Sequence, residues 1–141
     1  MRKPSATLVV DAAVQIAAVR GKRTKALRLV LGNCVLVTTS RAVEEAAKVI
    51  EFKLGRRDLL GAFGQLGAVI DVVDVQELQQ SIVLAREFLQ YAVNSRNGLT
   101  SDDHILALAW RAEADIWSPG RDFAGTGVAN WSTPNLVRAL A

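Results

Sequence analysis

The sequence contains very few residues of several chemically reactive types. Among its 141 residues there is one cysteine, one histidine, one methionine and one tyrosine. A single cysteine, Cys34, excludes an internal disulfide and a zinc site built on cysteines. The lone histidine, His104, has no partner at a spacing typical of metal or catalytic-triad chemistry, so we expect an exposed residue in the first turn of a helix.

Two common catalytic motifs are also missing. The chain has no Gly-x-Ser-x-Gly nucleophile elbow and no phosphate-binding loop ending in Gly-Lys-Ser or Gly-Lys-Thr. Gly61, Gly64 and Gly67 precede an expected strand instead of joining a strand to a helix, so they do not form a dinucleotide fingerprint. The first two absences exclude serine hydrolases with a nucleophile elbow and phosphate-loop nucleoside triphosphatases.

Long hydrophobic runs are absent as well. No apolar stretch reaches the roughly 18 residues of a membrane span, and the residues 1–4 lead directly into a strand. We therefore expect a soluble, cytoplasmic protein without membrane association. A chain of 141 residues with 50% hydrophobic content is long enough for one domain, covering residues 1–141, and too short for two.

Positive charge is concentrated in one segment, although the net charge of +3 is modest. Arg20, Lys22, Arg23, Lys25 and Arg28 follow the first strand and helix closely. Such a segment attracts a polyanion, and we expect Arg20, Lys22, Arg23 and Lys25 to contact nucleic acid. The alternative is an ordinary solvated surface.

Hydrophobic periodicity predicts strands and helices that alternate along the chain. Strands are expected at 8–11, 35–38, 68–75, 115–117 and, at an edge, 128–131. Helices are expected at 12–19, 24–31, 41–54, 58–63, 76–94, 102–113 and from 134. Ser40 is the expected cap of the helix at 41–54, and Thr133 that of the last helix. In the longest helix the expected core residues are Leu78, Ile82, Leu84, Phe88, Leu89 and Ala92. This alternation predicts an α/β sandwich with a largely parallel sheet.

Four acidic residues stand where a strand or helix meets a loop. They are Asp11, Glu45, Asp102 and Asp122. Ligands of an open parallel sheet bind beyond the carboxyl ends of the strands, so all four carboxylates are expected to be neighbours. Oxygen ligands of this kind suit Mg²⁺ or Mn²⁺ better than zinc.

Each of these acids also has a purely structural interpretation. Asp11 is then a turn residue, Asp122 pairs with Arg121, and Asp102 and Asp103 interact with a helix dipole. Helical spacing favours Asp102 over Asp103, which points toward Ala107 and Arg111.

The same spacing separates the two adjacent glutamates. It favours Glu45, beside Ala42 and Val49, over Glu44, which shares a face with Arg41 and Lys48. Glu44 and Asp103 remain the alternative ligands.

Several segments together resemble the PIN-domain nucleases over nearly the whole chain. They are residues 9–14, 43–46, 102–109 and 116–123, continued by 124–128 and Trp131. The resemblance implies a three-layer α/β/α sandwich, Mg²⁺ or Mn²⁺ held by acids, and hydrolysis of RNA phosphodiesters. Many small bacterial members resemble the toxins of toxin-antitoxin pairs, which implies an antitoxin partner and a homodimer.

Carried over by position, Asp11, Glu45 and Asp102 match the three principal acids of the family, and Asp122 matches the acid before phenylalanine in its fourth motif. The chain departs from the family pattern at Ala13, where a small polar residue is common, and at Gly120, where an acid is usual. A second hypothesis is therefore a catalytically degenerate PIN fold that binds RNA or protein.

A receiver-like signalling domain is a further alternative with acids at strand ends. That class requires an acid pair after the first strand and a lysine late in the chain. Here Asp11 is followed by Ala12 and Ala13, and no lysine follows Lys53. The residues therefore favour the nuclease hypothesis.

Overall fold

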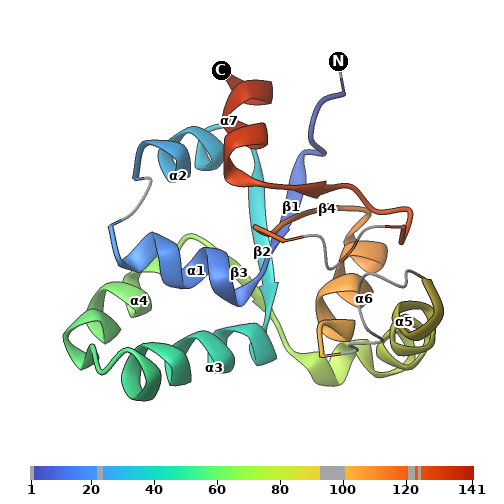
Figure 1. The fold of residues 1–141 in the computed structure, drawn as a ribbon, viewed down its shortest axis with the longest axis horizontal. Helices are drawn as coiled ribbons and strands as arrows, with labels where there is room; N and C mark the ends of the chain where they lie inside the picture. Colours follow the sequence, from blue (N-terminus) through green and yellow to red (C-terminus); the bar gives the residue numbers. More distant parts are fainter. Residues whose placement is uncertain (1, 22–23, 93–100, 121–122, 124) are drawn as a thin grey trace.

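The fold is built on a sheet of five parallel strands (Figure 1). The computed structural model describes residues 2–21, 24–92, 101–120, 123 and 125–141. The strands are β1 (Thr7–Val10), β2 (Val35–Thr39), β3 (Asp71–Val73), β4 (Asp115–Trp117) and β5 (Asn130–Trp131), arranged in the order β3-β2-β1-β4-β5. Because every pairing is parallel, the carboxyl ends of all strands lie at one edge of the sheet.

Helices cover both faces of this sheet. They are α1 (Ala12–Val19), α2 (Thr24–Leu31), α3 (Ser40–Lys48), α4 (Leu60–Leu66), α5 (Gln79–Ala92), α6 (Asp103–Ala112) and α7 (Thr133–Leu140). Single helical turns at Val49–Lys53, Arg57–Leu59 and Val75–Leu78 extend three of them. None of the helices within these ranges is long and apolar enough to span a membrane.

The two layers of helices follow from the alternation of side chains along β1. Val9 packs into the core formed with α5 and α6, whereas Leu8 and Val10 pack into the core formed with α1, α2, α4 and α7. Figure 1 shows α5 and α6 on one side of the strands and α1, α2 and α4 on the other. The expected three-layer α/β/α sandwich is confirmed.

Local boundaries differ from the expectations at several points. The third strand is only Asp71–Val73, and α4 runs through Gly61 and Gly64, which have ordinary helical backbones with open space around them. Thr39 caps α3 and Ser132 caps α7, each one residue before the expected cap. In both cases the preceding hydroxyl already accepts the bond from the first turn.

The inward stripe of α5 was predicted only in part. Ile82 and Leu89 are buried as expected, and Ala85 joins them, but Leu84 and Phe88 are 60% and 43% exposed. The reason is that α5 packs mainly on α6, so only a narrow stripe of its surface is covered.

Candidate active site

Asp11 is fixed where β1 ends and α1 begins. Its carboxylate oxygen Oδ1 accepts a hydrogen bond from the Val14 amide at 2.9 Å, which caps α1. Its own amide donates to the carbonyl of Trp117 on β4 at 3.4 Å. The side chain is half-buried. The cap therefore holds this carboxylate at the carboxyl edge of the sheet.

Two hydroxyl residues flank Asp11 on the neighbouring strands. The ladders pair Val9 with Val37 and Val10 with Trp117, so Thr39 and Ser118 stand beside Asp11 by continuation of these registers. Neighbouring strands lie roughly 4.8 Å apart. Ser118 is buried, and its hydroxyl has no hydrogen-bond partner in the part of the chain that the structure describes.

Asp102 reaches the same edge through a contact between α6 and β2. The hydroxyl of Thr39, at the end of β2, lies 2.6 Å from Nδ1 of His104 in the first turn of α6. Asp102 is the half-buried residue that begins this helix, and its carbonyl accepts bonds from Ile105 and Leu106. This contact joins the end of β2, beside Asp11, to the first turn of α6, which Asp102 precedes.

His104 is buried, with 1% of its surface exposed, and the expectation of an exposed residue was wrong. Helix α6 lies between the sheet and α5, so it is covered on nearly all sides. Burial lowers the pKa of His104 to about 4, assisted by the charge of Arg41 and opposed by that of Asp103. The hydroxyl of Thr39 already accepts from Ala42, so its own proton is available to the neutral ring.

Asp103 is also buried, with 1% of its side chain exposed, and its carboxylate contacts Arg41 and Arg86 instead of pointing toward Arg111 as expected. Oδ1 accepts a hydrogen bond from Nη1 of Arg41 on α3 at 3.0 Å. Oδ2 accepts from Nε of Arg86 on α5 at 3.0 Å, and Nη2 of the same guanidinium lies 2.9 Å away. Both oxygens are engaged by arginines, which makes Asp103 less available to a metal; the preference for Asp102 stays a prediction.

The remaining predicted ligands are less constrained. Glu44 and Glu45 on α3 are both exposed. Glu45 lies beside the buried stripe of Ala42 and Ala46, and Glu44 is turned further from it. The preference for Glu45 stays a prediction.

Three other residues of the sequence-based hypothesis lie outside the described part of the chain. They are the predicted ligand Asp122 and the predicted nucleic-acid contacts Lys22 and Arg23. Their roles also stay predictions.

The chemistry of this edge suits a hard divalent cation. Among the described residues no group of three acidic, histidine or cysteine side chains is close enough to hold a metal. Mg²⁺, however, commonly binds proteins through one or two carboxylates and keeps several waters. Asp11 and Asp102 are the carboxylates expected to form such a pair, and a hydrated cation would give the buried hydroxyl of Ser118 a partner.

Sequence reasoning missed the polar residues that connect the helices at this edge. Thr39, Arg41 and Arg86 link β2, α3 and α5 to the start of α6. Arg41 was interpreted as part of a solvated surface because it shares a face with Glu44. A signal was present in the adjacent acids Asp102 and Asp103, since two carboxylates in one helical turn require separate partners.

Comparison with known proteins gives the same fold. A model of the PIN domain matches residues 9–141. Similar solved structures include a toxin-antitoxin complex from Klebsiella pneumoniae, with 15% identity, a TM-score of 0.62, and 89% of this chain and 97% of that chain covered. The VapBC2 complex of Rickettsia felis, bound to a DNA fragment from its promoter, has 9% identity, a TM-score of 0.68 and coverage of 89% and 98%.

A third similar structure is VapC20 of Mycobacterium tuberculosis, a toxin that cleaves the Sarcin-Ricin loop. It has 18% identity and a TM-score of 0.66, and the match covers 86% of this chain and 96% of that one. No curated protein sequence matches the chain significantly. At these identities the structural matches establish the fold.

Proposed function

Because the chain belongs to the PIN-domain family, we propose that it is an endoribonuclease that hydrolyses RNA phosphodiesters with Mg²⁺ or Mn²⁺. The observation that carries this proposal is the connection from Asp11 through Thr39 and His104 to Asp102. It supports a shared position of these two carboxylates, which come from distant parts of the sequence, at one edge of the sheet.

Asp11 and Asp102 are the central metal ligands in this proposal, and Glu45 and Asp122 complete the set. A bound divalent ion would polarise the scissile phosphate and lower the pKa of a water for in-line attack. The protein's own residues orient the carboxylates: the cap of α1 fixes Asp11, and the contact between Thr39 and His104 fixes the start of α6. Fixed carboxylates need no reorganisation when substrate binds.

The substrate of this reaction is single-stranded RNA, by resemblance to the family. Arg20 and Lys25, with Lys22 and Arg23 between them, would attract its backbone toward the protein. Arg20 follows the carboxyl end of α1, whereas Asp11 precedes its start, so about 12 Å of helix separates them. This basic segment would therefore bind a part of the RNA that is distant from the scissile phosphate.

An antitoxin protein is the proposed partner. The solved structures from Klebsiella pneumoniae and Rickettsia felis are both complexes of this kind. An apolar groove of about 440 Å³ between α1, α2 and the start of α7 supports a protein partner, since it is lined by Ala17, Leu27 and Pro134 among others. A homodimer and a cytoplasmic location complete the proposal.

RNA cleavage tests the function directly. Purified protein is incubated with single-stranded and structured RNA in Mn²⁺, Mg²⁺ or chelator. We expect cleavage with metal only, and its loss in Asp11→Asn and Asp102→Asn. Asp71→Asn, a change of an exposed aspartate on β3, serves as the control.

The competing function is a PIN fold that binds RNA or protein without cleaving it. Two residues favour it: Ala13 and Gly120 are both exposed near the site and supply no polar side chain. RNA that stays intact at every metal concentration would establish this alternative. Titration of labelled RNA would then show whether the fold still binds it.

A further inference from the structure

The pairing of Asp103 with Arg41 and Arg86 leads to a separate inference about RNA binding. We propose that Arg41 and Arg86 form a clamp for a backbone phosphate of the RNA substrate, with Asp103 as the buried residue that holds both guanidinium groups in place. The proposal rests on the proposed nuclease function for the identity of its ligand. It adds a phosphate site to the metal site at the same edge.

The clamp has a surplus of positive charge. One carboxylate, from Asp103, faces two guanidinium groups at 3.0 Å and 2.9 Å. The cluster therefore has a net charge of about +1, next to carboxylates that would repel a phosphate on their own.

Both arginines are also accessible to a ligand, although their anchor is buried. Asp103 is 1% exposed, while the side chains of Arg41 and Arg86 are 41% and 59% exposed. A guanidinium has five N–H donors, and Asp103 engages one of Arg41 and at most two of Arg86. The remaining donors match the fork geometry that phosphate oxygens accept.

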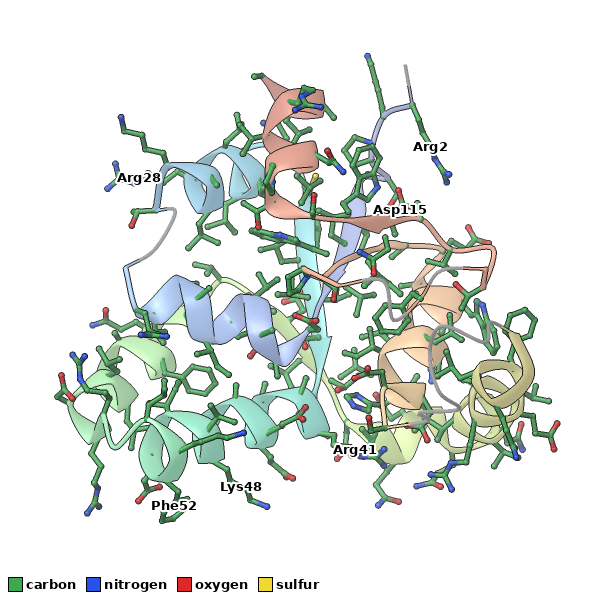
Figure 2. All side chains as sticks on the ribbon, viewed as in Figure 1. Arg2, Arg28, Arg41, Lys48, Phe52 and Asp115 are labelled. Carbon is green, nitrogen blue, oxygen red and sulfur yellow. The ribbon has the colours of Figure 1, made fainter. Side chains whose placement is uncertain are left out.

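The position of the clamp agrees with that of the candidate metal site. Arg41 is in the first turn of α3, one turn before Glu45, and Asp103 directly follows Asp102. Figure 2 shows Arg41 between the beginnings of α3 and α6, whereas Arg28 of the basic segment projects from α2 at the upper left of the view. A phosphate on the clamp would therefore be near the scissile bond.

Prior anchoring gives these arginines an advantage over free surface cations. A free arginine loses side-chain freedom when it binds a ligand, which costs binding free energy. Asp103 has already restricted Arg41 and Arg86, so less entropy is lost on binding. The alternative is that the three residues only join α3, α5 and α6 structurally.

Binding of fluorescent single-stranded RNA in chelator, followed by anisotropy over a range of salt concentrations, separates these two roles. We expect Arg41→Gln and Arg86→Gln each to weaken binding about tenfold and to reduce the slope of log affinity against log salt by about 0.7. Arg111→Gln is the matched control, because Arg111 binds a backbone carbonyl at the opposite end of α6. It should bind RNA like the wild type.

Asp103→Asn provides a second variant that keeps both cations. It should lower the melting temperature, because a buried charged anchor is lost. RNA binding should weaken less than in either arginine variant, because both cations remain and one negative charge is removed, and the salt slope should stay at or above the wild-type value. Wild-type affinity and salt slope in both arginine variants would refute the clamp, as would a wild-type protein that binds no RNA. The assay contains no metal, so a failure of cleavage does not affect its outcome.

Discussion

The burial of His104 makes the stability of this protein depend on pH in a predictable direction. The pKa of His104 is about 4 in the folded protein and 6.5 in an ordinary setting, so the unfolded chain binds the proton more tightly. Above about pH 7 the ring is neutral in both the folded and the unfolded protein, so it does not change the pH dependence of stability. As the pH falls from 6.5 toward 4, protonation of the unfolded state progressively removes stability.

The size of this effect follows from the two pKa values. Between pH 7 and pH 5 the histidine should lower the free energy of unfolding by about 2 kcal/mol. His104 is the only histidine in the chain, so no other imidazole contributes. Carboxylates titrate at lower pH, and their contribution is removed by comparison with a variant lacking the histidine.

Urea denaturation at several pH values gives the required free energies. His104→Asn is the comparison, because its amide oxygen can accept the bond that Thr39 donates to Nδ1. This variant should be less stable at pH 7 but should lose about 2 kcal/mol less than the wild type on going to pH 5. Parallel curves for the two proteins over this range would refute the reasoning.

Three further predictions concern the site and the assembly. Asp11→Asn should leave the melting temperature of the metal-free protein unchanged or slightly higher, because asparagine also caps helices. In the wild type, Mn²⁺ at 100 times its Kd should raise the free energy of unfolding by about 2.7 kcal/mol, and melts with and without the ion should show that the variant lacks this stabilisation. Thr39→Val should cost about 2–4 kcal/mol in urea denaturation, because it removes the α3 cap and the partner of His104, whereas Thr39→Ser should cost about 1 kcal/mol. Light scattering at micromolar concentration should give twice the mass of one chain, and a monomer would contradict the expected homodimer.

The overall architecture was predictable because strand and helix periods alternate clearly along the chain. Val9, Val37 and Ile116 belong to short apolar runs that end in polar residues, a pattern typical of buried parallel strands. The positions of Asp11 and Asp102 were predicted in the same way, from where apolar segments begin and end. Both acids lie at element boundaries in the structure.

The predictions that were wrong concern the direction of side chains on helices that do not have a single apolar face. Helix α6 is buried from Asp103 to Ala109, so periodicity could not identify an outward side. The partners of Asp103 and His104 come from residues far away in the sequence, 62 positions for Arg41 and 65 for Thr39. Such contacts depend on how α3, α5 and α6 pack, which local spacing does not specify.

The central claim is that Asp11 and Asp102 hold one divalent cation together. Isothermal titration of Mn²⁺ into the wild type, Asp11→Asn and Asp102→Asn measures this directly. We predict binding to the wild type and a loss of at least tenfold in affinity in each variant, with Asp71→Asn unchanged. Equal affinity in the wild type and Asp102→Asn would contradict the claim.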